Sequence, residues 1–98
     1  MAPLTGAQRR HLRALGHHLK PVVIVGENGV TPALITQVET QLLAHELIKV
    51  KAHEGNRLEM KTAAAEISEG AHAEIAQLMG HTILLYKRRE NKPSIELP

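Results

Sequence analysis

The chain has 98 residues, of which 43% are hydrophobic and 22% charged, so it fits a single domain over residues 1–98 with an aliphatic core. It has no cysteine, which excludes disulfides and thiolate zinc sites. The chain has no Phe and no Trp, and Tyr86 is its one Tyr. A single ring excludes an aromatic platform for stacking nucleic-acid bases. The net charge is only +2, but basic residues gather toward both ends of the chain and glutamates between them. If the termini lie together in the fold, one face becomes cationic and suits a polyanionic partner.

The sequence also bears on location. Residues 4–19 carry Arg9, Arg10 and Arg13 where a signal peptide has its apolar run. No stretch approaches the roughly 20 apolar residues that are needed to span a bilayer. We therefore expect a cytoplasmic protein with no membrane partner.

Local patterns predict alternating helices and strands. Helices are expected over residues 5–16, 31–44 and 58–69, and strands over residues 22–25, 47–52 and 82–86. Thr5 and Thr31 are predicted N-caps, the second followed by proline at the first helical position, and Gly16 and Gly70 are expected to end their helices. The β-branched run of the first strand is typical of a buried strand. The strict alternation of the second predicts one buried and one wet side.

Two segments are less well defined. Composition alone makes residues 73–79 compatible with either a helix or a strand. The tail over residues 91–98 carries two prolines and is expected to add a short edge segment around Ile95 and Leu97. The order of elements indicates an α/β fold, α-β-α-β-α followed by one or two strands, with the helices layered on one face of a sheet.

The segment that points to a function is Gly26-Glu27-Asn28-Gly29, between the first strand and the second helix. Glycines let another backbone approach closely, and amides at a helix N-terminus favour phosphate. Gly-x-x-Gly loops in this setting contact nucleic-acid backbone in KH domains. On its own the pattern fits an ordinary strand-to-helix turn equally well. Lys20 and the arginines of the first helix favour the binding interpretation, whereas Glu27 repels phosphate unless it points away.

Three stretches occur in order along the chain: LKPVVIVGENGVT at residues 19–31, HELIKVK at 45–51 and MGHTILLYKR at 79–88. Together they resemble the bacterial stand-alone CRM domain, the chloroplast RNA splicing and ribosome maturation family. The resemblance implies a four-stranded mixed sheet with three helices on one face, similar to the C-terminal domain of translation initiation factor three. It further implies that residues 73–78 form a strand, and that the protein binds ribosomal RNA precursor during assembly of the large subunit.

The resemblance also implies roles for individual residues. Gly26 and Gly29 would clamp the RNA backbone and Asn28 would make a polar contact. Glu27 is a further candidate RNA-binding residue of the loop, although family members often carry a basic residue inside it. The other candidate RNA-binding residues are Lys20, Arg9, Arg10, Arg13, Lys49, Lys51, Lys87 and Arg88. The strand lysines have a second interpretation, because alternating lysines also keep an exposed strand face soluble.

Other functions find less support in the sequence. His17 and His18 point about 100° apart on a helix, and no pair among the seven histidines has i, i+4 spacing, so no metal is expected. No Walker loop, dinucleotide fingerprint or nucleophile motif is present, so we expect neither an enzyme nor a cofactor nor a small-molecule substrate. The remaining alternative is a protein-binding adaptor, in which the acidic middle segment or the helix around Val38 docks on a ribosomal or assembly factor.

Overall fold

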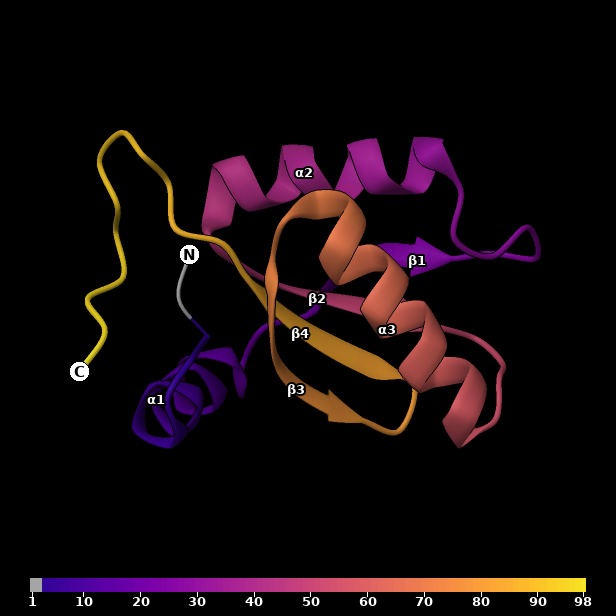
Figure 1. Cartoon of the computed structure of the whole chain (residues 1–98), viewed down its shortest axis with the longest axis horizontal. Coiled ribbons are helices and arrows are strands. Elements are labelled where there is room, and N and C mark those ends of the chain that lie inside the picture. Colours follow the sequence, from indigo (N-terminus) through magenta and orange to yellow (C-terminus); the bar gives the residue numbers. More distant parts are fainter. Residues whose placement is uncertain (1–2) are drawn as a thin grey trace.

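The computed structural model describes residues 3–98, and in this part of the chain three helices and four strands follow one another in the expected order (Figure 1). Their bounds are α1 Gly6–Gly16, β1 Pro21–Val25, α2 Pro32–His45, β2 Leu47–Ala52, α3 Arg57–Ala71, β3 Glu74–Met79 and β4 Thr82–Tyr86. The sheet has the order β1-β2-β4-β3, in which β1 and β2 are parallel and the other neighbours antiparallel. This confirms an α/β fold with a four-stranded mixed sheet.

Side-chain caps explain where the first two helices begin. Thr5 Oγ1 accepts a hydrogen bond from Gln8 N at 3.1 Å, and Gln8 Oε1 accepts one from Thr5 N at 3.0 Å. Thr31 Oγ1 accepts from Leu34 N at 3.1 Å, with Pro32 at the first helical position. These bonds satisfy amides that have no partner inside the helix. Both N-caps predicted from the sequence are confirmed.

The expectation that all three helices lie on one face of the sheet is wrong. α2 and α3 pack on one face, in an apolar cluster that includes Val38, Val50 and Ile67. α1 packs on the opposite face, in a second cluster that includes Leu12 and Leu84 (Figure 1). The side of α2 follows from the right-handed crossover between the parallel strands β1 and β2. α1 precedes the first strand, so that rule does not fix its side.

β1 is an edge strand with only one buried face. Val23 and Val25 point into the core, while Val22 and Ile24 on the α1 side of the sheet remain 42% and 44% exposed. α1 packs mainly on β2, β3 and β4 and leaves this side of β1 uncovered. The prediction that residues 22–25 form a buried strand is therefore correct for Val23 and Val25 and wrong for Val22 and Ile24.

α3 continues past Gly70, where the sequence predicted its end. The helix ends at Ala71, and the left-handed residue is His72, with a φ of 54°. Gly70 instead lies against α2, where an added Cβ would come within 2.8 Å of Ile35 Cδ1. Glycine thus permits a close approach of the two helices. Residues 74–79 then form β3, which confirms the strand that the family resemblance implied.

The tail over residues 91–98 packs on the α1 side of the molecule without forming the expected edge segment. Ile95 and Leu97 contact the second apolar cluster, and Gln8 Nε2 donates to Pro98 O at 3.3 Å. Side-chain packing and hydrogen bonds to side chains, rather than strand pairing, therefore hold this proline-containing segment. The two ends of the described chain lie together, which is the condition for the cationic face expected from the sequence.

A buried carboxylate fixes the tail to the junction of α2 and β2. Glu46 is 0% exposed and has a φ of 59°. Its Oε2 accepts a hydrogen bond from Arg89 N at 2.8 Å. Its Oε1 accepts from Ser94 N, Ser94 Oγ and Ile95 N at 2.6, 2.8 and 3.0 Å. Burial alone raises the pKa of this carboxyl, but the hydrogen bonds outweigh burial and lower the pKa to about 2.

Candidate nucleic-acid interface

The Gly26–Gly29 segment forms a tight turn between β1 and α2, which we call the glycine turn. Gly29 N donates to Gly26 O at 3.0 Å, which leaves Glu27 and Asn28 exposed at the corner. Gly29 has a φ of 66°, a conformation that strains residues with a Cβ. Gly26 has an ordinary φ, and no heavy atom lies within 4 Å of the position that a Cβ would take. The turn therefore requires Gly29, whereas Gly26 leaves the backbone open to a ligand.

A shallow groove of about 560 Å³ separates the glycine turn from the start of α2. Glu27 is the one charged residue in its lining. Leu34 N is taken by Thr31 Oγ1. Because Pro32 has no N–H, the Ala33 amide is the first-turn donor that is left facing out of the helix end. A helix N-terminal amide beside open backbone suits an anionic oxygen.

The candidate lysines lie at different distances from the glycine turn. Lys51 pairs with Ile24 across the β1–β2 ladder and so lies close to the turn, on the α1 side of the sheet. Lys49 lies two residues further back on the same face. Lys20 precedes β1, about 20 Å from Gly26 along the strand. The structure thus brings Lys51 to the turn and sets Lys20 at the other end of the strand.

The arginines of α1 form a separate group. Arg9, Arg10 and Arg13 are all exposed. In Figure 1, α1 lies at the end of the sheet opposite the glycine turn. The structure places these residues beyond the start of β1, away from the glycine turn. A ligand that contacts both groups has to run along the sheet.

An exposed part of the sheet connects the two groups. It consists of Val22 and Ile24 from β1 and Lys49 and Lys51 from β2, and we call it the open strip. Alternation places all four side chains on the α1 side, where Val22, Ile24 and Lys51 are exposed and Lys49 is half-buried. The strip combines two cations with two exposed aliphatic side chains.

The open strip ends at an apolar hollow beside the end of α1. Leu15, Leu19 and Val22 line this hollow of about 420 Å³, with Lys20 at its side. Among the leucines of α1, Leu12 is buried and Leu15 is exposed. Sequence reasoning missed Val22 and its neighbours, because adjacent residues of a uniform β-branched run give no sign of which side is exposed.

The C-terminal cations divide into bound and exposed groups. Lys87 Nζ donates to Ala71 O at the end of α3 at 3.0 Å, and Arg89 Nη1 donates to Ala44 O in α2 at 3.3 Å. Both therefore neutralise carbonyls at helix C-termini. Arg88, between them in sequence, is exposed.

The histidines do not converge on one another. Within residues 3–98, no group of three His or Glu side chains is arranged to hold a metal ion. His17 and His18 contact each other edge to face, with ring centroids 5.1 Å apart. His81 Nε2 lies 2.8 Å from Gly55 O in the β2–α3 turn. Over the same residues no helix has the length and apolar character that crossing a membrane requires.

A family model for the CRS1 / YhbY (CRM) domain matches residues 4–87. The chain belongs to this CRM domain family. The matched range contains every helix and strand, the glycine turn and the open strip. Only residues 1–3 and 88–98, which include Arg88, Arg89 and the tail, lie outside the matched range of this CRM domain.

Similar proteins cover the CRM domain almost from end to end. The chain is 39% identical over 95 residues to a Bacillus subtilis protein named "Probable RNA-binding protein YqeI", covering 97% of this chain and 99% of that one. It is 37% identical over 98 residues to a Haemophilus influenzae protein named "RNA-binding protein", covering 100% and 98%. The solution structure of a hypothetical protein from Staphylococcus aureus superposes with a TM-score of 0.85 at 36% identity, over 97% and 99% of the two chains.

Proposed function

We propose that this CRM domain binds RNA on one continuous surface that runs from the glycine turn along the open strip to Lys20 and α1. The observation that carries the proposal is the placement of Lys51 and Lys49 between the open helix N-terminus and the arginines of α1. The surface follows one face of β1 for about 20 Å, which suits an extended polyanion. The relatives named as RNA-binding proteins support RNA as that polyanion.

The chemistry of this surface favours recognition of the RNA backbone. The cations would neutralise phosphates, and the Ala33 amide with Asn28 would hold one phosphate beside the open backbone of Gly26. Val22 and Ile24 offer aliphatic contact to sugars or base faces, without the strong stacking that aromatic rings provide. We therefore propose binding by shape and charge, with weak preference among base sequences. Lys87 contributes little, because its ammonium group already binds a helix carbonyl.

We further propose that the RNA is the precursor of large-subunit ribosomal RNA, and that the domain assists assembly in the cytoplasm by binding rather than by catalysis. The resemblance of the three sequence stretches to ribosome-maturation proteins supports this target. The absence of a recognisable nucleophile or phosphate-transfer motif in the sequence supports a binding role.

The open strip is tested by charge reversal against a matched control. Lys49→Glu with Lys51→Glu changes the strip, and Arg57→Glu with Lys61→Glu makes the same change in net charge on exposed positions of α3. Binding to a labelled large-subunit ribosomal RNA fragment is measured by fluorescence anisotropy over a series of salt concentrations. About five phosphate contacts predict a log-log slope of roughly −3.5 to −4.5.

The strip variant is expected to bind at least tenfold more weakly, with a slope shallower by about 1.4, because two phosphate contacts are lost. The α3 variant is expected to keep a slope close to that of the wild type. Equal losses in the two variants would show that only overall charge matters and would contradict the proposed surface.

A further inference from the structure

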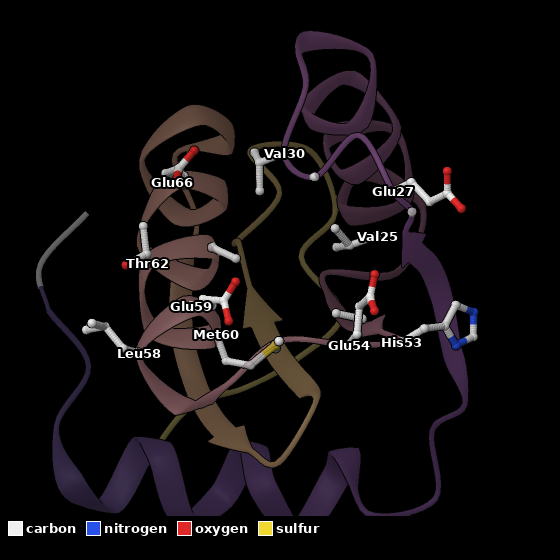
Figure 2. A pocket seen from close by; sticks show the side chains of 15 residues that line it. Val25, Glu27, Val30, His53, Glu54, Leu58, Glu59, Met60, Thr62 and Glu66 are labelled. Carbon is white, nitrogen blue, oxygen red and sulfur yellow. The ribbon is translucent and has the colours of Figure 1, made fainter.

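A second and larger groove lies on the other side of the glycine turn, between the turn and α3 (Figure 2). Its volume is about 870 Å³. Val25 and Ala52, at the carboxyl ends of the parallel strands β1 and β2, lie in its lining. Crevices outside the carboxyl ends of parallel strands are a common position for ligands in α/β sheets. The RNA surface proposed above leaves this groove unused.

The lining of this groove is acidic. It includes Glu27, Glu54, Glu59 and Glu66, and none of its 15 lining residues is a lysine or an arginine. Figure 2 shows Glu59 and Glu66 on α3, with Glu54 across the groove and the carboxylate of Glu27 pointing outward from the rim. Glu59 Oε1 accepts from Asn56 N at 3.0 Å as a helix cap. Glu54 and Glu66 are therefore the carboxylates best placed to meet a ligand.

Apolar side chains lie between these carboxylates. Val30, which is half-buried, borders the space between α3 and the turn, and the largely buried Val25 and Met60 contribute only their outer edges to the lining (Figure 2). Leu58, at the same groove, is 72% exposed. An exposed hollow with apolar walls indicates a binding site rather than a surface that contacts only solvent. Acidic groups above apolar walls complement side chains that have a long aliphatic stem and a cationic head.

We propose that this acidic groove binds an arginine- and lysine-rich segment of a partner protein. The cationic heads meet the carboxylates of Glu54 and Glu66, and the aliphatic stems pack on Val30 and on the outer edges of Val25 and Met60. The same carboxylates repel RNA phosphates, so RNA stays on the α1 side of the sheet. The domain thereby presents opposite charges on the two sides of the glycine turn and holds RNA and a basic protein segment at the same time.

The probe for this groove is a short synthetic peptide in which arginine and leucine alternate, with a control peptide that has glutamine in place of arginine. Titration of the ¹⁵N-labelled full chain is expected to shift amide signals of residues 26–30, 52–55 and 58–66 and to leave those of α1 unchanged. The glutamine peptide is expected to give no shifts. Shifts spread over all acidic regions, or shifts that depend on protein concentration without any peptide, would overturn the proposal.

Matched variants assign the binding to named carboxylates. The double substitution Glu54→Gln with Glu66→Gln is expected to weaken binding of the arginine peptide about three- to tenfold, because two partly exposed ion pairs are lost. Glu69→Gln with Glu90→Gln removes the same charge from exposed positions outside the groove and is expected to leave peptide affinity unchanged. Equal weakening in both pairs would overturn the assignment. RNA affinity measured on the same samples is expected to stay at or above the wild-type value, and its loss in the groove variant would place RNA in the groove instead.

Discussion

Replacing Glu46 by glutamine tests whether an ionised buried carboxylate holds the tail in place. In the structure, Oε1 accepts three hydrogen bonds from the tail and Oε2 accepts one from Arg89 N. Glutamine keeps one acceptor oxygen and replaces the other by an amide that donates. Whichever way the amide turns, one N–H donor of the protein then faces another donor.

The structure gives the size and sign of the effect. Burial raises the pKa of Glu46, and the hydrogen bonds then lower it from 4.5 to about 2. A shift of this size corresponds to about 3 kcal/mol in favour of the folded, ionised protein. Because the folded pKa is lower than the unfolded one, this stability is present above about pH 4.5 and is lost as the pH falls toward 2. Glutamine retains some acceptor bonds, so we expect Glu46→Gln to cost about 2 kcal/mol near neutral pH.

Urea unfolding followed by circular dichroism measures this effect. At neutral pH the free energy of unfolding of Glu46→Gln is expected to be about 2 kcal/mol lower, with a melting temperature lower by roughly 10 °C. The difference from wild type is expected to shrink as the pH falls from about 4.5 toward 2. Glu96→Gln, an exposed tail carboxylate, is the control and is expected to match the wild type. Equal stability of Glu46→Gln and wild type at neutral pH, or a difference that persists unchanged at low pH, would refute the reasoning.

Two further predictions concern the glycine turn and α1. Gly26→Ala is expected to leave the free energy of unfolding unchanged, whereas Gly29→Val, at a φ of 66°, is expected to lower it by about 1–2 kcal/mol in a urea titration. If the two variants are equally stable, the conformational requirement assigned to Gly29 is wrong. Arg9→Glu with Arg13→Glu is expected to weaken binding to every RNA tested by a similar factor and to make the salt slope shallower. Unchanged affinity in anisotropy would remove α1 from the interface.

Features set by neighbouring residues could be predicted from the sequence. The caps at Thr5 and Thr31 depend on a side chain and an amide three residues apart, and the alternation of residues 47–52 depends on adjacent positions. The glycine turn likewise follows from Gly29 and its immediate neighbours. Such local signals were sufficient for the order of every element except β3, which composition left open, and for most boundaries.

Features set by contacts between distant residues could not be predicted in this way. The side of the sheet that α1 covers depends on how Leu12 packs against β2 and β4, and this in turn leaves Val22 and Ile24 exposed. Gly70 looked like a helix end, but it is a contact point with Ile35 of another helix. The buried role of Glu46 could not be predicted, because its partners lie more than 40 residues away in the chain. No pattern within a few residues carries that information.

The same distinction applies to the candidate interface. The sequence identified the glycine turn and each candidate cation, but its charge pattern could not divide them into groups. The sheet register places Lys51 near the turn, whereas Lys87 donates its hydrogen bond to the carbonyl of Ala71. The acidic groove combines residues from the ends of two strands, from two loops and from α3. The sequence therefore showed the acidic charge of its middle segment but not the groove.

The central claim, that the glycine turn and the open strip contact ribosomal RNA, is tested most directly by ultraviolet crosslinking in the native cell. The attached RNA is sequenced, and the crosslinked peptides are identified by mass spectrometry. We predict RNA from the large-subunit precursor, attached to peptides that contain residues 20–29 or 49–51. Crosslinks that are few and dispersed over many RNAs, or that map to α3 and residues 53–55, would contradict the proposed surface.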